Sequence, residues 1–175
     1  MSVKLKTSIW DIRKLIITKR LNLLIGSGAS VPAIKLMAQC KGETQEEKNK
    51  DLMNNVKKVS SELICDSNSK EAKDVLENYT AFLKLILEML EKSNAREVPK
   101  SANLFTTNYD LFVEKSIDLL SLTHRFIFND GTSGYFKHYL DSSNYNKAVS
   151  YRGINDNYNE EIVTLNLIKP HGSMM

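Results

Sequence analysis

Short, mainly apolar runs alternate along this chain with longer stretches in which apolar residues recur every three or four positions. From residue 72 to residue 90 the apolar positions follow helical spacing, which predicts an amphipathic helix packed on a core. Shorter runs have the length of buried strands and lie at residues 21–25, 102–107, 125–128 and 162–168. Strands separated by helices favour parallel pairing, so the pattern predicts an α/β fold in which helices flank a parallel sheet.

Other segments carry weaker patterns. Helices are predicted for residues 8–20 and 111–120, and another helix is expected to begin around Val31–Pro32, because proline suits a first helical turn. Residues 41–70 are polar and are expected to form helix and loop at the periphery of the core. Residues 133–159 are rich in Tyr, Asn, Ser and Asp, and we expect an irregular segment there.

Length and composition are those of a globular domain. The chain has 175 residues, of which 42% are apolar and 26% charged, so we expect one domain over residues 1–175 with a helical insertion at about 41–98. The net charge of +3 is too small to indicate nucleic-acid binding. Cys40 and Cys65 lack the close spacing of a zinc site or a disulfide framework, and each is expected to be a buried or idle thiol.

No stretch has the character of a membrane span or an export signal. Residues 1–7 are polar, and the longest apolar stretch, residues 82–90, is interrupted by Lys84 and Glu88. A cytoplasmic protein without membrane attachment is therefore expected.

Three segments place polar or glycine-rich residues directly after an apolar strand. They are residues 26–30, 106–110 and 171–173. In open α/β sheets, ligands bind outside the carboxyl ends of the strands. We therefore expect these three segments to converge on one ligand site.

The first segment, Gly26-Ser27-Gly28-Ala29-Ser30, has the character of a phosphate-binding loop. Its glycines let the backbone approach an anion closely, and a following helix would present free N–H groups. It departs from the dinucleotide fingerprint, because Val31 stands where the third glycine should be. A tight strand-to-helix turn that binds nothing is the alternative.

The other two segments offer side chains for chemistry. Asn108 has a donor and an acceptor that suit a ribose hydroxyl or a water molecule, and a cap of the next helix explains it equally well. For Asp110 the helix cap is the better explanation. His171 follows a strand that Pro170 ends, so it is expected at a surface edge. There it could act as a general base near neutral pH, or it could simply hydrogen-bond a loop.

Three short motifs, one at each of these strand ends, resemble the motifs of a known protein family. Leu24-Ile25-Gly26-Ser27-Gly28-Ala29-Ser30, Phe105-Thr106-Thr107-Asn108-Tyr109-Asp110 and Lys169-Pro170-His171-Gly172-Ser173 occur in the order seen in sirtuin-like domains. They resemble the bacterial sirtuin-like NAD hydrolases of antiphage defence more closely than protein deacetylases. Residues 129–134 also resemble a segment between the second and third motifs of that bacterial group.

The resemblance implies a Rossmann-like fold that binds NAD as a substrate and releases nicotinamide from ADP-ribose, in linear or cyclic form. Asn108 would position the nicotinamide ribose or the attacking water, Asp110 would help to order that region, and His171 would be the general base. The glycine loop would hold the pyrophosphate. The positions implied to bind the dinucleotide are Gly26, Ser27, Gly28, Ala29, Ser30, Thr107, Asp110, Gly172 and Ser173.

The family pattern also sets the alternatives. Deacetylating sirtuins carry Asp-Phe-Arg after the glycine loop and two zinc-binding cysteine pairs. This chain has Val31-Pro32-Ala33-Ile34-Lys35 and no such pairs, so no zinc is expected and a protein deacylase is disfavoured. Related domains continue beyond the His-Gly-Ser motif, so we expect this domain to be truncated at its C-terminal end. A regulatory module that binds NAD or ADP-ribose without turnover is then the main alternative.

The resemblance further implies partners. In such defence systems a sensor domain or protein unleashes the activity, and the loss of NAD halts the infected cell. We therefore expect a homo-oligomer or a larger defence complex, with no membrane and no nucleic acid bound directly by this domain.

Overall fold

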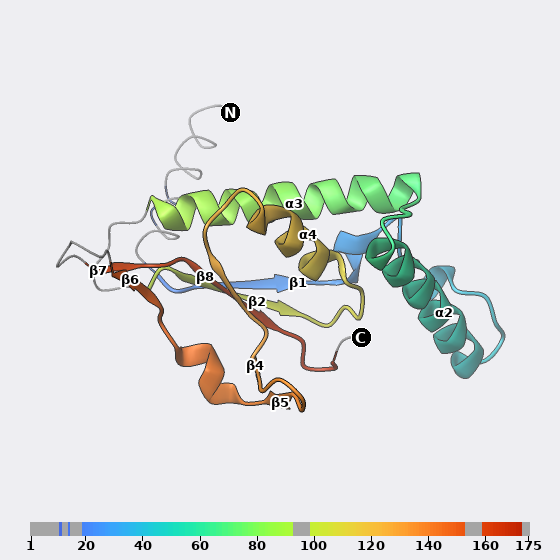
Figure 1. The fold of residues 1–175 in the computed structure, drawn as a ribbon. Helices are drawn as coiled ribbons and strands as arrows, with labels where there is room; N and C mark the ends of the chain where they lie inside the picture. Colours follow the sequence, from blue (N-terminus) through green and yellow to red (C-terminus); the bar gives the residue numbers. More distant parts are fainter. Residues whose placement is uncertain (1–10, 12–13, 15–18, 93–98, 153–158, 173–175) are drawn as a thin grey trace. The chain divides into compact units, whose positions relative to one another are not determined.

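The computed structural model describes residues 11, 14, 19–92, 99–152 and 159–172. Its main sheet has four parallel strands in the order β1-β2-β8-β3, with flanking helices (Figure 1). The strands are β1 (Leu21–Ile25), β2 (Ser101–Thr106), β8 (Thr164–Ile168) and β3 (Ile127–Asn129). The prediction of an α/β fold with a parallel, Rossmann-like sheet is confirmed, and each of the four strands lies within two residues of a predicted run or inside it.

The helices are α2 (Gln45–Ile64), α3 (Lys70–Glu91) and α4 (Phe112–Ser121), and short 3-10 turns are η1 (Ser27–Ser30), η2 (Met37–Gln39) and η3 (Ser142–Asn146). The amphipathic helix and the helix after the second motif are therefore confirmed. The helix predicted for residues 8–20 lies largely outside the described residues. Among the described residues, no helix is long and apolar enough to cross a membrane.

Two predictions of local structure are wrong. No α-helix begins at Val31–Pro32, because η1 ends at Ser30 and Val31 is extended, with φ −79° and ψ 139°. A residue before proline avoids the helical region, since the proline ring crowds its backbone.

Residues 133–159 are also not wholly irregular. They contribute to two antiparallel pairs, β4 (Thr132–Ser133) with β5 (Tyr139–Leu140), and β6 (Ser150–Arg152) with β7 (Asn159–Glu161). Strands this short have too few alternating positions to leave a hydrophobic pattern.

The chain divides into two compact units. The first contains residues 1–23, 84–104 and 124–168, and the second contains residues 24–83, 105–123 and 169–175. The prediction of a single domain over residues 1–175 stays a prediction. All three strand-end motifs, up to the last described residue, belong to the second unit.

In the first unit, four asparagines form a hydrogen-bonded ladder, one from each strand of the main sheet. Asn129 Nδ2 donates to Asn166 Oδ1 at 3.0 Å, and Asn166 Nδ2 donates to Asn103 Oδ1 at 2.8 Å. Asn103 Nδ2 then donates to Asn22 Oδ1 at 2.8 Å. The register that pairs Asn129 with Asn166 places the two side chains opposite each other. We call Asn22, Asn103, Asn166 and Asn129 the asparagine ladder.

The apolar neighbours of the ladder explain why it lies on one face. Side chains of a strand alternate between the two faces of a sheet. Leu104 and Leu165, which are adjacent in sequence to Asn103 and Asn166, are fully buried. The core of this unit therefore lies on the face opposite the ladder.

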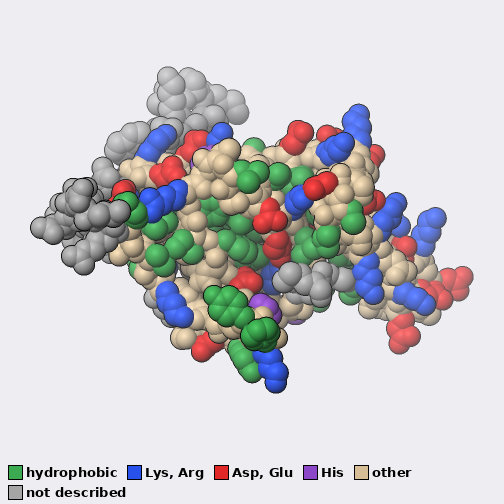
Figure 2. All heavy atoms as spheres, viewed as in Figure 1, with side chains coloured by type: hydrophobic (Ala, Val, Ile, Leu, Met, Phe, Trp, Pro, Cys, Tyr) green, Lys and Arg blue, Asp and Glu red, His purple; other side chains and the backbone are tan. Residues whose placement is uncertain are grey.

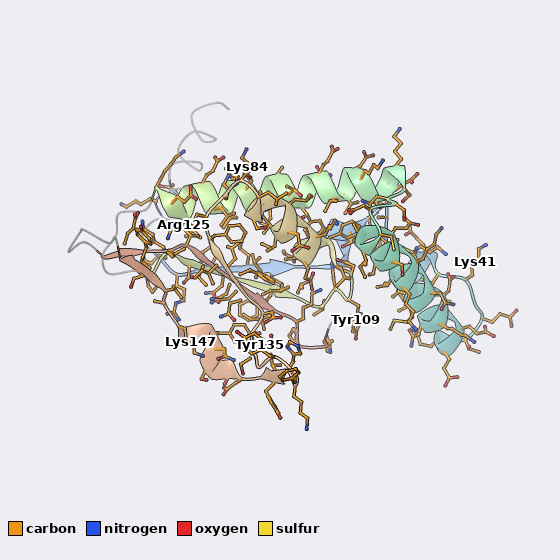
Figure 3. The ribbon with its side chains drawn as sticks, viewed as in Figure 1. Lys41, Lys84, Tyr109, Arg125, Tyr135 and Lys147 are labelled. Atoms are coloured by element: carbon orange, nitrogen blue, oxygen red, sulfur yellow. The ribbon has the colours of Figure 1, made fainter. Side chains whose placement is uncertain are left out.

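A short hairpin of the first unit exposes aromatic residues. Gly134 has φ +98° in the turn between β4 and β5, and a Cβ there would come within 2.2 Å of the Lys137 carbonyl oxygen. The side chains of Tyr135 and Phe136 are fully exposed at this turn, where Figure 3 labels Tyr135.

In the second unit, α4 packs against α2 and the first part of α3. Tyr79 of α3 stacks on Phe112 of α4 with ring centroids 5.5 Å apart. The Thr80 hydroxyl lies 3.2 Å from Ser116 Oγ, and Lys115 Nζ pairs with Asp66 at 2.6 Å. The outer surface of α2 carries charged side chains of both signs, as Figure 2 shows.

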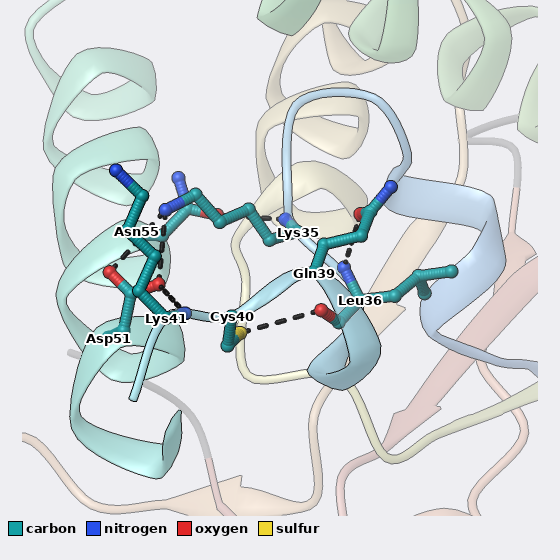
Figure 4. Close-up of polar contacts among 7 residues, drawn as sticks. All are labelled: Lys35, Leu36, Gln39, Cys40, Lys41, Asp51 and Asn55. Atoms are coloured by element: carbon teal, nitrogen blue, oxygen red, sulfur yellow. Dashed lines mark hydrogen bonds and ion pairs between the residues drawn. The ribbon is translucent and has the colours of Figure 1, made fainter. Parts of the chain in front are cut away.

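Residues 35–41, which follow the glycine loop, are held against α2 (Figure 4). Asp51 accepts hydrogen bonds from the Lys41 backbone N–H at 2.9 Å and from Lys35 Nζ at 3.1 Å. Asn55 Oδ1 accepts from the Lys35 backbone N–H at 2.8 Å. The Lys41 N–H and then the Lys35 ammonium lower the pKa of Asp51 below its ordinary value.

Candidate functional site

The glycine loop keeps open space where side chains would otherwise be. Gly26 and Gly28 do not have positive φ, and a Cβ on either would meet no atom of the described residues within 4 Å, apart from its own chain neighbours. The Ala29 backbone N–H donates to the Gly26 carbonyl at 3.0 Å, which closes the turn. Neither glycine is therefore required by backbone conformation or by packing, and this favours a loop that a ligand approaches over a bare tight turn.

Ser30 closes the loop and lies at the centre of a buried polar cluster. Ser27, Gly28 and Ala29 are exposed, whereas Ser30 is fully buried. Ser30 Oγ donates to Asp110 Oδ2 at 2.7 Å and lies 3.0 Å from the Tyr79 hydroxyl and 3.1 Å from Asn108 Nδ2. We call Ser30, Tyr79, Asn108 and Asp110 the Ser30 cluster.

The hydrogen atoms of the Ser30 cluster can be assigned from its acceptors. An ionised carboxylate only accepts, so the single Ser30 hydroxyl hydrogen points to Asp110. Ser30 Oγ must then accept from Tyr79 and from Asn108. Asp110 also accepts from the backbone N–H of Phe112, the first residue of α4, at 3.3 Å, whereas the N-cap position of that helix is Leu111.

The hydrogen-bond partners of Asn108 also determine the orientation of its side-chain amide. Asn108 Nδ2 donates to Ser30 Oγ and to the Gly26 carbonyl oxygen at 3.1 Å, which uses both of its hydrogens. The Asn108 backbone N–H donates to Thr106 Oγ1 at 3.0 Å. The Asn108 side chain, which is 8% exposed, can therefore offer a ligand only its acceptor, Oδ1.

Two residues of this site were missed by the sequence reasoning. Tyr79 lies on the buried face of the amphipathic helix and was assigned no chemistry there. Its position still carried a signal, since a buried tyrosine hydroxyl needs a hydrogen-bond partner. Burial raises the pKa of Tyr79 to about 12. The second is Thr106, whose hydroxyl accepts from the Asn108 backbone, whereas the predicted Thr107 is exposed.

The third motif contacts the second. Lys169 Nζ donates to the Asp110 carbonyl oxygen at 2.6 Å and pairs with Glu114 at 2.7 Å. His171 is exposed in the turn after β8, and its ring centroid lies 6.4 Å from that of Tyr109 (labelled in Figure 3). Gly172 is exposed beside it with φ +82°, and Ser173 lies outside the described residues.

A pocket of about 460 Å³ lies between the glycine loop and α3. It is lined by the end of β1, by Gly26, Gly28 and Ala29, and by Asn78, Tyr79 and Phe82 of α3. Its volume falls in the range of small-molecule sites, and most of its lining side chains are apolar. Gly26 and Tyr79 belong both to the pocket and to the contacts around Asn108, whereas Asn108 and His171 do not line it.

The structure therefore connects the three predicted motifs within the second unit through contacts of Asn108, Asp110 and Tyr109. Thr107 and Ser27 are exposed and make no side-chain hydrogen bond within the described part of the chain. No group of three His, Cys, Asp or Glu side chains among the described residues is placed to hold a metal ion. Comparison with protein-family models and with curated protein sequences found no match.

Proposed function

We propose that this chain is a sirtuin-like NAD hydrolase, which cleaves the bond between nicotinamide and ribose. The observation that carries the proposal is the orientation of Asn108, whose amide hydrogens bind Gly26 and Ser30 so that Oδ1 is left for a ligand. An acceptor beside an open glycine loop suits a ribose hydroxyl or a water molecule near a pyrophosphate.

The proposed roles follow from position and chemistry. The open positions at Gly26 and Gly28 receive the pyrophosphate, and the neighbouring pocket takes one apolar end of the dinucleotide. Asn108 Oδ1 accepts a hydrogen bond from the nicotinamide ribose or from the attacking water. His171 takes a proton from that water as its oxygen bonds to C1′, while the bond from C1′ to the pyridinium nitrogen breaks and nicotinamide leaves.

The resemblance to antiphage-defence enzymes supplies the proposed biological setting. NAD depletion would halt an infected cell once a sensor domain or protein releases the activity. The proposal includes assembly into a homo-oligomer or a larger complex in the cytoplasm, and it assigns no zinc, membrane or nucleic acid to this chain.

The test is nicotinamide release from NAD by purified protein and by His171→Ala. A positioned base contributes about 10²- to 10⁴-fold, so we expect a loss of that size. His138→Ala is the matched control, because His138 is an exposed histidine of the first unit, outside the three motifs. Unchanged release by His171→Ala would contradict the assignment.

One observation favours a second candidate, a module that binds NAD or ADP-ribose without turnover. His171 is exposed, whereas catalysis benefits from a site that excludes water. This module predicts thermal stabilisation by ADP-ribose, about 2.7 kcal/mol at one hundred times its Kd, without any nicotinamide release.

A further inference from the structure

Tyr79 reaches the site from a helix that lies outside the three motifs. Its ring stacks on Phe112 with an interplanar angle of 9°, and it is only 5% exposed. Its hydroxyl lies 3.0 Å from Ser30 Oγ, and this contact joins α3 to the hydrogen bonds described for the Ser30 cluster. The ring is therefore held by packing, and the hydroxyl is free to act on polar partners.

The direction of the Tyr79 hydrogen bond is determined by its surroundings. Ser30 donates its only hydroxyl hydrogen to Asp110, so Tyr79 must be the donor to Ser30 Oγ. With Tyr79 and Asn108 both donating, the two lone pairs of Ser30 Oγ are occupied. Ser30 then has one rotamer and one hydrogen position that satisfy all its partners.

We propose that Tyr79 is a positioning residue of this site, whose hydroxyl locks Ser30 so that Ser30 in turn holds the Asn108 amide with Oδ1 available to the ligand. The expected effect on nicotinamide release rests on the proposed function, whereas the expected effect on the order of the Asn108 amide does not. The positioning role makes the state of the site depend on α3, because a displacement of this helix removes a donor from Ser30.

The Tyr79 phenol is protonated at neutral pH, so it is a hydrogen-bond donor there. Burial raises the pKa of Tyr79 to about 12, and the negative charge of Asp110 adds to that shift. The donor role is therefore not lost by titration at any ordinary assay pH.

The experiment compares Tyr79→Phe with Thr80→Val. Tyr79→Phe keeps the ring on Phe112 and removes only the hydroxyl. Thr80→Val removes the next hydroxyl along α3, which bonds Leu76 O at 2.7 Å and Ser116 at 3.2 Å but not the Ser30 cluster. Both variants lose one hydrogen-bonded hydroxyl of α3. If Tyr79 had only a structural role, the two variants would behave similarly.

Two readouts are measured on the full chain. Nicotinamide release should show kcat lowered about 10-fold in Tyr79→Phe, with KM for NAD within about 2-fold, because misplacement of a reacting group by 1 Å costs up to about 10²-fold. Exchange of the Asn108 side-chain amide hydrogens, followed by NMR without any ligand, should be about 10-fold faster in Tyr79→Phe than in the parent chain. Thr80→Val should change neither quantity by more than about 2-fold.

The two readouts separate this inference from the proposed function. Faster Asn108 exchange in a chain that releases no nicotinamide would support the positioning role and overturn the hydrolase. Equal exchange in Tyr79→Phe and Thr80→Val would overturn the positioning role, even if the parent chain is an active hydrolase.

Discussion

The asparagine ladder of the first unit and the Ser30 cluster of the second unit are both networks of side-chain hydrogen bonds, built differently. In the ladder, Asn166 donates through Nδ2 and accepts through Oδ1, so both ends of its amide are used by protein. In the cluster, Asn108 uses both Nδ2 hydrogens, and its Oδ1 has no hydrogen bond from the described part of the chain.

This difference separates a structural amide from one that can serve a ligand. An amide bonded at both ends has its nitrogen and its oxygen both engaged by protein and links neighbouring strands. An amide bonded only through its hydrogens is held in one orientation and keeps a free acceptor. The ladder also uses one neutral residue type, whereas the cluster contains the carboxylate of Asp110, which accepts the Ser30 hydrogen and so makes Tyr79 the donor to Ser30.

The largest difference between the two networks is expected in the rate of nicotinamide release when one asparagine of each network is replaced. Asn108→Ala should lower the rate of nicotinamide release by about 10²-fold, because the ribose or the attacking water loses its positioning group. Asn103→Ala should leave the rate per folded molecule unchanged within about 2-fold, although it weakens the fold. Release assays well below the unfolding temperature measure both, and an equal loss in both variants would show that the ladder shares the function of the cluster.

The next effect concerns the middle and the end of the ladder. Asn166→Ala removes one acceptor of Asn129 and the donor to Asn103, so we expect the free energy of unfolding to fall by about 2 kcal/mol, since each hydrogen bond contributes about 1 kcal/mol. Asn22 is exposed at the end of the ladder, and Asn22→Ala should cost about 0.5 kcal/mol or less. Urea unfolding curves compare the two, and similar losses would mean that the ladder is not a stabilising chain.

The smallest effect is a pH dependence that only the cluster should show. Burial raises the pKa of Tyr79 to about 12, whereas the pKa of a tyrosine in the unfolded chain stays near its ordinary value of 10.0. Above pH 10 the unfolded chain loses a proton that the folded chain keeps, so the stabilising contribution of Tyr79 is full below pH 10 and falls towards pH 12. The parent chain should lose about 1.4 kcal/mol per pH unit in that window relative to Tyr79→Phe.

Denaturant unfolding at pH 9, 10 and 11 measures this difference. Asn166→Ala serves as the control, because an asparagine does not titrate and its effect should stay constant over the same range. A constant gap between the parent chain and Tyr79→Phe would show that the Tyr79 hydroxyl is not buried in the folded protein.

Much of the fold could be read from local pattern. The run at residues 21–25 matches β1 residue for residue, and the spacing from Ala72 to Leu90 predicted a helix that the structure has at Lys70–Glu91. These elements follow from hydrophobic period, which is a local property. The turn at Val31–Pro32 could not be predicted from the hydrophobic pattern, because it follows from the backbone restriction before proline. The antiparallel pairs after Gly131 could not be predicted either, because strands of two or three residues are too short to show an alternation of apolar and polar positions.

The candidate site divides in the same way. The order of the motifs and the placement of their polar residues after strands were sufficient to single out Gly26, Asn108, Asp110 and His171. Only the tertiary structure decided how these residues contact one another. It buries Ser30 and directs its hydroxyl hydrogen to Asp110, and it leaves Asn108 with only its acceptor available. It also brings Tyr79 next to Ser30. The physical reason is that hydrogen-bond direction depends on which donors and acceptors meet, and residues separated by 49, 78 and 80 positions meet only when the chain is folded.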